Sequence, residues 1–108
     1  MSYNVELTDN FKKEAKRLVK KYRSLKIEIA TLVDELEIDP IKGTPLGNDI
    51  YKIRLSVKSK GKGKSGGVRI LTYAKIEDEN VFLFSIYNKG ERDSLSDSEI
   101  KQLIQNFK

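Results

Sequence analysis

The feature that most limits the fold of this chain is an almost wholly apolar run, Val81–Tyr87. A short run without polar alternation is typical of a central strand that is buried on both faces. The residues before it, Glu77–Asn80, carry a turn signal, and the segment Val68–Lys75 before that turn reads as a second strand. The chain is therefore predicted to build a sheet that includes residues 81–87.

Two segments nearer the N-terminus have helical rather than strand periodicity. Apolar residues recur at i, i+4, i+7 and i+8 within residues 11–22 and again within residues 25–36. The junction between the segments is so short that the two helices are predicted to form an antiparallel hairpin. Thr8 and Ser24 are the predicted capping residues of these helices.

The rest of the chain supplies short elements. Residues 3–7 and 51–57 alternate between apolar and polar side chains, which predicts two more strands. Residues 40–49 contain two prolines and two glycines and are interpreted as a loop. Ser96–Glu99 has the sequence of a capping box and opens a short C-terminal helix. The predicted order is β-α-α-β-β-β-α, in one α+β domain over residues 1–108.

Composition restricts the chemistry. The chain has no cysteine and no histidine, which excludes disulfides, thiolate chemistry and the usual acid–base group at neutral pH. No cluster of metal ligands stands out, so neither a metal nor another cofactor is implied. The 21 Lys and Arg against 16 Asp and Glu give a net charge of +5, which favours an anionic partner: nucleic acid, an acidic protein segment or a membrane surface. No signal core or membrane-spanning segment is evident, so a cytoplasmic location is expected.

Three cations are predicted to share one face of the sheet. Lys52 and Arg54 alternate with apolar residues on their strand and therefore project together. Arg69 joins them if the next strand pairs with theirs as a hairpin, and such crowding is unfavourable unless an anion arrives. The face is either an anion site or an ordinary solvated sheet surface.

Two further segments carry candidate functional side chains. Residues 58–67 interleave glycine with lysine, which suits close approach to phosphate groups, although a lysine-rich hairpin tip that only adds solubility has the same composition. Tyr87 and Lys89 leave the buried strand together, either toward a site or merely into the connection to the last helix. The lysines of the loop are Lys58, Lys60, Lys62 and Lys64.

These motifs, in this order, resemble the RelE/ParE superfamily of toxins from type II toxin–antitoxin systems. The resemblance lies in Tyr51–Leu55, the glycine-rich basic loop, Gly67–Tyr73 and Ser85–Glu91, and the long loop is most similar to that of the HigB-type branch. It implies a small antiparallel sheet with the helical hairpin packed on one face and a basic concave face. It also implies ribosome-dependent cleavage of mRNA in the ribosomal A site. The implied partners are mRNA, the ribosome and a cognate antitoxin, with DNA contacted only through the antitoxin.

The resemblance also assigns roles to residues. Lys52 and Arg54 match basic residues that hold the mRNA backbone, and Arg69 matches the arginine that stabilises the scissile phosphate. Tyr87 and Lys89 lie where related toxins place further active-site residues. The four loop lysines are assigned to binding of RNA or the ribosome.

Two departures from the family pattern bear on the mechanism. Gly90 stands where RelE-type toxins have an arginine, and Leu95 or Ser96 stands where they have a catalytic tyrosine. The implied reaction is attack of a 2′-hydroxyl on the adjacent phosphate, which needs no metal and no enzyme nucleophile. The base that takes the proton is left open among Tyr87, Lys52 and Lys89. The alternative functions are a ParE-like inhibitor of DNA gyrase and a toxin-like RNA-binding domain without catalysis.

Overall fold

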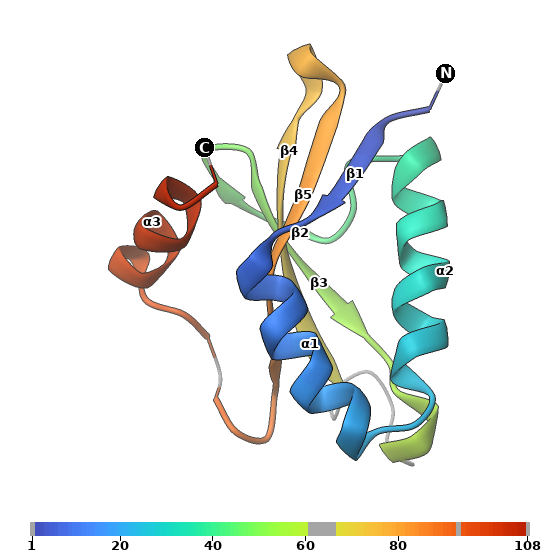
Figure 1. Ribbon diagram of the computed structural model, residues 1–108. Coiled ribbons are helices and arrows are strands. Elements are labelled where there is room, and N and C mark those ends of the chain that lie inside the picture. Colours follow the sequence, from blue (N-terminus) through green and yellow to red (C-terminus); the bar gives the residue numbers. More distant parts are fainter. Residues whose placement is uncertain (1, 61–66, 93, 108) are drawn as a thin grey trace.

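The computed structural model describes residues 2–60, 67–92 and 94–107. A five-stranded sheet, in the order β1-β5-β4-β3-β2, lies between a pair of helices and a single C-terminal helix (Figure 1). The predicted α+β class is confirmed. The elements are β1 Asn4–Leu7, α1 Asp9–Lys21, α2 Leu25–Ile38, β2 Thr44–Gly47, β3 Ile50–Leu55, β4 Val68–Lys75, β5 Asn80–Asn88 and α3 Asp97–Gln105.

Strand β5 occupies the interior of the sheet, between β1 and β4. Val81, Leu83 and Phe84 are fully buried, which confirms the central strand expected from the apolar run. Strands β2 to β5 pair antiparallel, as predicted, but β1 pairs parallel with β5, so the sheet is mixed. No tight turn joins β1 to β5, and the direction of β1 is therefore set by tertiary packing rather than by a hairpin.

The helical hairpin covers one face of the sheet. Phe11, Ala15 and Leu18 of α1 are buried there, and α2 buries four residues at the same helical spacing. They pack on alternate residues of the strands, such as Ile53 and Ile70, in one wholly apolar cluster. The prediction that helices 11–22 and 25–36 form one hairpin is thereby confirmed.

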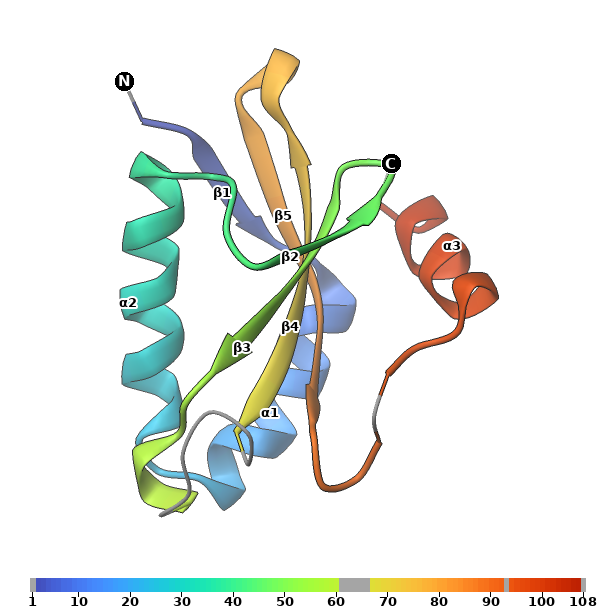
Figure 2. The same cartoon turned by 180° about the vertical axis from the view of Figure 1, so that it is seen from behind.

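Helix α3 covers part of the opposite face. Ile100 is buried and Phe107 packs against it in a smaller cluster with Leu71, Tyr73 and Tyr87 of the sheet. The view from behind shows β2 and β3 in front, with α3 beside β4 and β5 (Figure 2). Because α3 has only nine residues, it leaves much of this face of the sheet uncovered.

Two of the three predicted helix caps form as expected. The Thr8 hydroxyl accepts a hydrogen bond from the Phe11 N–H at 3.2 Å, and Ser96 and Glu99 form a complete capping box. Ser24 is the N-cap residue of α2 but makes no capping hydrogen bond with its side chain. Its hydroxyl instead accepts a hydrogen bond from the Ser59 N–H at 3.0 Å, because that segment packs against the start of α2.

The predicted loop 40–49 contains an element that the sequence reading missed. Strand β2 pairs with β3 at the edge of the sheet, and all four of its residues are exposed. Without a buried face the strand shows no apolar alternation, and Pro45 is tolerated because an edge strand leaves one side of its backbone unpaired. Gly43 precedes it at φ +90°, where a side chain would collide with the Lys52 carbonyl.

Candidate active site

Strand register brings three predicted site residues into one row. Arg54 on β3 lies directly opposite Arg69 on β4, and Arg69 lies directly opposite Tyr87 on β5. Cross-strand partners project to the same face of a sheet. The hairpin pairing on which the sequence argument depended is therefore confirmed. Lys52 stands two residues before Arg54 and shares its face.

The row lies on the face that α3 partly covers. Lys52 pairs across strands with Leu71, which belongs to the apolar cluster under α3. We call Lys52, Arg54 and Arg69 the cationic row. It stands on the side of the sheet opposite the helical hairpin, so its side chains do not compete with the main core for space.

Arg69 is an unusual member of the row because it is buried. Only 3% of its surface is exposed, and its Nη1 donates a hydrogen bond to the Val68 carbonyl at 3.3 Å. Burial, and secondly the charge of Arg54, hold the pKa of Arg69 below its ordinary value, while Tyr87 acts in the opposite direction. The protein thus keeps a desolvated guanidinium beside a second one, an arrangement that a bound anion would relieve.

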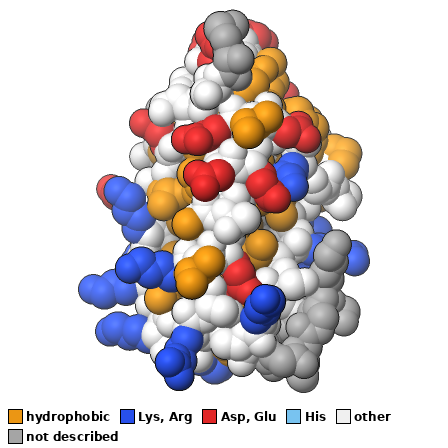
Figure 3. Space-filling view, turned by 90° about the vertical axis from the view of Figure 1, so that its right-hand side faces the viewer, with side chains coloured by type: hydrophobic (Ala, Val, Ile, Leu, Met, Phe, Trp, Pro, Cys, Tyr) orange, Lys and Arg blue, Asp and Glu red, His pale blue; other side chains and the backbone are white. Residues whose placement is uncertain are grey.

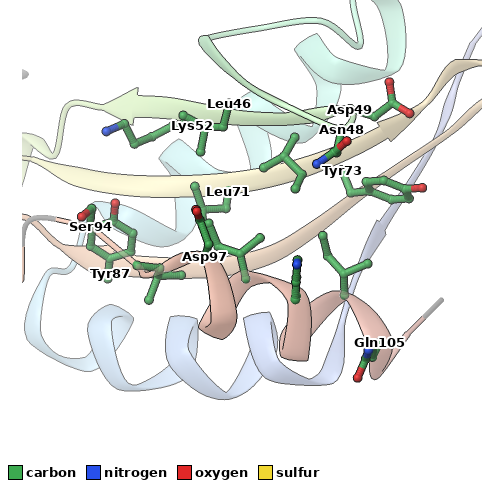
Figure 4. Close-up of a pocket in the computed structure, with 15 residues that line it drawn as sticks. Leu46, Asn48, Asp49, Lys52, Leu71, Tyr73, Tyr87, Ser94, Asp97 and Gln105 are labelled. Atoms are coloured by element: carbon green, nitrogen blue, oxygen red, sulfur yellow. The ribbon is translucent and has the colours of Figure 1, made fainter.

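A cleft of about 880 Å³ separates α3 from the sheet and adjoins the row. Apolar side chains form its floor, including Leu71 and Ile100. Lys52, Tyr87 and Ser94 lie toward one end, and Asn48 and Asp49 toward the other (Figure 4). A partly apolar cleft next to Lys52 and two arginines suits a nucleotide, with a surface for the base and charge for the phosphate.

Tyr87 and Lys89 differ in their surroundings. Tyr87 is 4% exposed and packs in the cluster under α3, yet it lines the cleft. Lys89 follows the last residue of β5, is half-buried, and does not line the cleft. Its N–H donates to the Gly67 carbonyl at 3.3 Å, which ties the end of β5 to the start of β4.

Asn88 supports the end of β5, next to Tyr87, and the sequence reading did not single it out. It is buried, and its Nδ2 donates to the Tyr22 hydroxyl of the helical hairpin at 2.8 Å. Its Oδ1 accepts from the Gly90 N–H at 3.1 Å, and its carbonyl accepts from two further N–H groups of the turn. Asparagine before Lys-Gly is a turn signal that would have identified it.

The turn after β5 is also held by two ion pairs. Arg17 of α1 contacts Glu91 at 3.0 Å, and Arg92 contacts Glu99 of α3 at 2.9 Å. Each pair is exposed, so each contributes little to stability by itself. Together they connect the turn that carries Lys89 to helices on both sides of the sheet.

The lysine loop is only partly described. Lys58 is exposed and begins a 3-10 turn, Lys58–Lys60, whose first N–H donates to the Glu28 carboxylate at 2.8 Å. Lys62 and Lys64 lie outside the described residues. The assignment of this loop to RNA binding therefore stays a prediction.

Among the described ranges 2–60, 67–92 and 94–107, no group of three or more Asp or Glu side chains is arranged to hold a metal ion. Within the same ranges, no helix has the length and apolar character needed to cross a bilayer.

Comparison with known proteins places the chain in a family. A sequence profile described as the RelE toxin of the RelE / RelB toxin-antitoxin system matches residues 7–107. A mutant of the E. coli toxin RelE in the free state superposes with a TM-score of 0.62, at 17% identity, over 100% of both chains. A mutant of the same toxin in complex with a peptide of the antitoxin RelBc gives 0.50 at 21% identity, over 100% of this chain and 97% of that one. A metal-bound toxin from Helicobacter pylori gives 0.52 at 20% identity, over 82% of this chain and 97% of that one. At these identities the structures establish the RelE-like fold.

Proposed function

The chain belongs to the RelE toxin family of toxin–antitoxin systems, and from that premise we propose that it cleaves mRNA on the ribosome as a metal-independent endoribonuclease. The observation that carries the proposal is the direct pairing of Arg54 with Arg69, the latter buried beside Tyr87. This row offers two guanidinium groups to one phosphate from a rigid sheet.

The proposed reaction uses the RNA's own nucleophile. The 2′-hydroxyl attacks the neighbouring phosphorus, its proton passes to a base, and a bond forms between the 2′-oxygen and phosphorus. The bond from phosphorus to the 5′-oxygen then breaks, and that oxygen takes up a proton, which leaves a 2′,3′-cyclic phosphate. Arg69 and Arg54 stabilise the extra negative charge of the phosphorane, which is the step where fixed cations contribute most.

We assign proton transfer to Lys52 and Tyr87. Lys52, a member of the cationic row, and Tyr87 both line the cleft. Free lysine and tyrosine ionise at about pH 10, so neither is an efficient base at neutral pH without help. Since the chain has no histidine, its catalysis relies on positioning and electrostatics. This supports a requirement for the ribosome, which would hold the mRNA in the reactive geometry.

We assign a cognate antitoxin as the protein partner, as in the complex of the E. coli toxin with its antitoxin peptide. An acidic or amphipathic segment laid over the cationic row would remove the site from RNA. The helical hairpin is the other surface available for such a segment.

The deciding experiment maps 5′ ends of an mRNA in a cell-free translation system with purified protein, with and without ribosomes. Cuts within codons that require translation, and that disappear with Arg69→Ala, would support the proposal. Cleavage of naked RNA at a similar rate would instead identify a general ribonuclease.

A ParE-like function has one specific observation in its favour, since Leu95 or Ser96 replaces the family's catalytic tyrosine. Intact mRNA in every lane, together with DNA double-strand breaks in treated cells, would establish that alternative.

A further inference from the structure

Helix α1 exposes a second strongly cationic surface, on the side of the sheet away from the cationic row. Within its 13 residues α1 has six Lys and Arg and two acidic residues. All six cations are exposed. We call this set the α1 surface; it comprises Lys12, Lys13, Lys16, Arg17, Lys20 and Lys21.

The positions of these cations follow from the helix period. Phe11, Ala15 and Leu18 face the sheet, and the six cations occupy the half of the helix that points away from it. The side chain of Glu14, which would otherwise neutralise part of the surface, turns inward and accepts a hydrogen bond from the Ser85 hydroxyl at 2.9 Å. The remaining acid of the helix, Asp9, lies at its first residue, and of the six cations Arg17 is paired with Glu91 of the turn after β5.

Solubility alone does not account for this arrangement, because the neighbouring helix has the opposite charge. α2 has one lysine and four acidic residues in its 14 residues. Seen from the α2 side, acidic side chains gather over the upper half, and basic side chains line the edge that α1 forms (Figure 3). A solvated hairpin would be served equally well by mixed charges on both helices.

We propose that the α1 surface binds the phosphate backbone of structured RNA, as a docking site separate from the cationic row. The proposal deepens the proposed function and rests on it for the choice of RNA as the polyanion. A protein that binds one RNA strand needs cations on one side of its sheet only. Cations on both sides suit a protein that is surrounded by RNA, as in a cavity of the ribosome.

The composition of the α1 surface favours RNA over a protein partner or a membrane. The large exposed hydrophobic side chains of the described residues are Ile27, Ile38, Ile41, Leu46 and Ile76, and none of them is on α1. Protein interfaces need an apolar, lysine-poor centre, and membrane-surface helices need an apolar face to insert. The apolar face of α1 is already buried against the sheet.

Direct binding to a short synthetic RNA duplex tests the proposal apart from catalysis, because a duplex holds the 2′-hydroxyl away from in-line attack. The variant Lys13→Gln/Lys20→Gln removes two charges, one toward each end of the surface. The control, Lys42→Gln/Lys75→Gln, removes the same net charge from half-exposed lysines elsewhere, which pair with Glu35 and Asp78. Affinity is measured between low and moderate salt, with a DNA duplex of the same sequence as a second ligand.

The expected result is a loss of roughly tenfold or more in affinity for RNA in the α1 variant, and a salt slope smaller by about 2, with the control unchanged. Unchanged binding, or an equal loss in both variants, would overturn the proposal. Preference for the DNA duplex, or weaker binding of an acidic antitoxin peptide alone, would also overturn it. Failure to cleave mRNA while the α1 variant still loses RNA affinity would reject the proposed function and leave this inference standing.

Discussion

The two faces of the sheet are built differently. The face under α1 and α2 holds a cluster of fifteen buried apolar residues. The face under α3 has six buried residues in its cluster and shares its surface with Lys52, Arg54 and Arg69. The same strands supply both faces, since residues alternate between them.

This difference indicates that the two faces of one sheet have different roles. Residues that point to the hairpin face mainly stabilise the fold, and residues that point to the other face form the candidate site. A residue of the apolar cluster under the hairpin is surrounded by hydrocarbon, and its replacement should change the free energy of unfolding. In the cationic row, Lys52 lines the cleft and Arg54 is exposed, so replacement of either should change activity first. The four predictions below test that division, from the largest expected effect to the smallest.

The largest effect on stability is expected on the hairpin face. Leu18→Ala removes a fully buried side chain of α1 and should lower the free energy of unfolding by about 2–5 kcal/mol. The matched change on the other face is Leu103→Ala in α3, where the leucine is only half-buried and the loss should stay below about 2 kcal/mol. Urea denaturation of both variants measures the difference. Equal losses of unfolding free energy in the two variants would show that the two faces contribute equally to stability.

The cationic row should show the reverse pattern. Arg69→Ala should reduce ribosome-dependent mRNA cleavage by about 10²–10³-fold, as for loss of one fixed charge-stabilising donor. Its free energy of unfolding should fall by less than that of Leu18→Ala, because the lost packing is offset in part by removal of a charge that burial and Arg54 both disfavour. Lys75→Ala, at the other end of β4, is the control for both assays. A strongly destabilised Arg69→Ala protein would assign Arg69 a structural role.

Glu14 connects the two faces, and its replacement should affect both properties. Its Oε1 accepts hydrogen bonds from the Asn10 Nδ2 at 2.9 Å, the Ser85 hydroxyl at 2.9 Å and the Ile86 N–H at 3.2 Å. These contacts hold β5 where its register with β4 shifts, just before Tyr87 comes opposite Arg69.

Glu14→Ala should therefore cost about 1–3 kcal/mol of stability, because it leaves buried donors without their acceptor. It should also lower kcat more than it raises KM, since Tyr87, which would be displaced, acts in the chemical step of the proposed mechanism. Glu14→Gln keeps one acceptor oxygen, so it should retain most of the stability and most of the kcat of the unaltered protein. A stability loss with full kcat would limit Glu14 to a structural role.

The smallest effect is a pH dependence at α3. The backbone hydrogen bond from Ser96, and then the Arg92 side chain, hold the pKa of Glu99 below its ordinary value of 4.5. The resulting stabilisation is present above that value and is lost as the pH falls through the lowered pKa. The amide signal of Ser96, followed by NMR as the pH is lowered, should report loosening of the cap. In Glu99→Gln the same signal should be insensitive to pH in this range.

Much of this architecture could be predicted because burial leaves a pattern in the sequence. The apolar run 81–87 identified β5, and the helical spacing from Phe11 and from Leu25 identified the hairpin. Alternation around Lys52 and Arg54 correctly predicted which side chains share a face. In each case the local period of the strand or helix carries the information.

What could not be predicted depends on contacts between distant segments. The exposed strand β2 has no buried side, and the parallel direction of β1 has no local signal. The burial of Arg69 depends on its neighbours on β3 and β5, which only the pairing of distant strands brings beside it. The role of Asn88 depends on the hydroxyl of Tyr22, which only the folded chain brings within 2.8 Å.

The pairing of β1 with β5 has a consequence for the order in which the protein is made. Asn4 on β1 lies beside Asn80 on β5, so the sheet joins an early segment of the chain to a late one. Tyr87 reaches its place opposite Arg69 only when β5 joins β4. During synthesis, the nascent chain therefore has no complete site until β5 has emerged, and contacts between such distant segments form slowly. A truncated product that ends between β4 and β5 carries the cationic row but lacks Tyr87, and it therefore lacks the complete site.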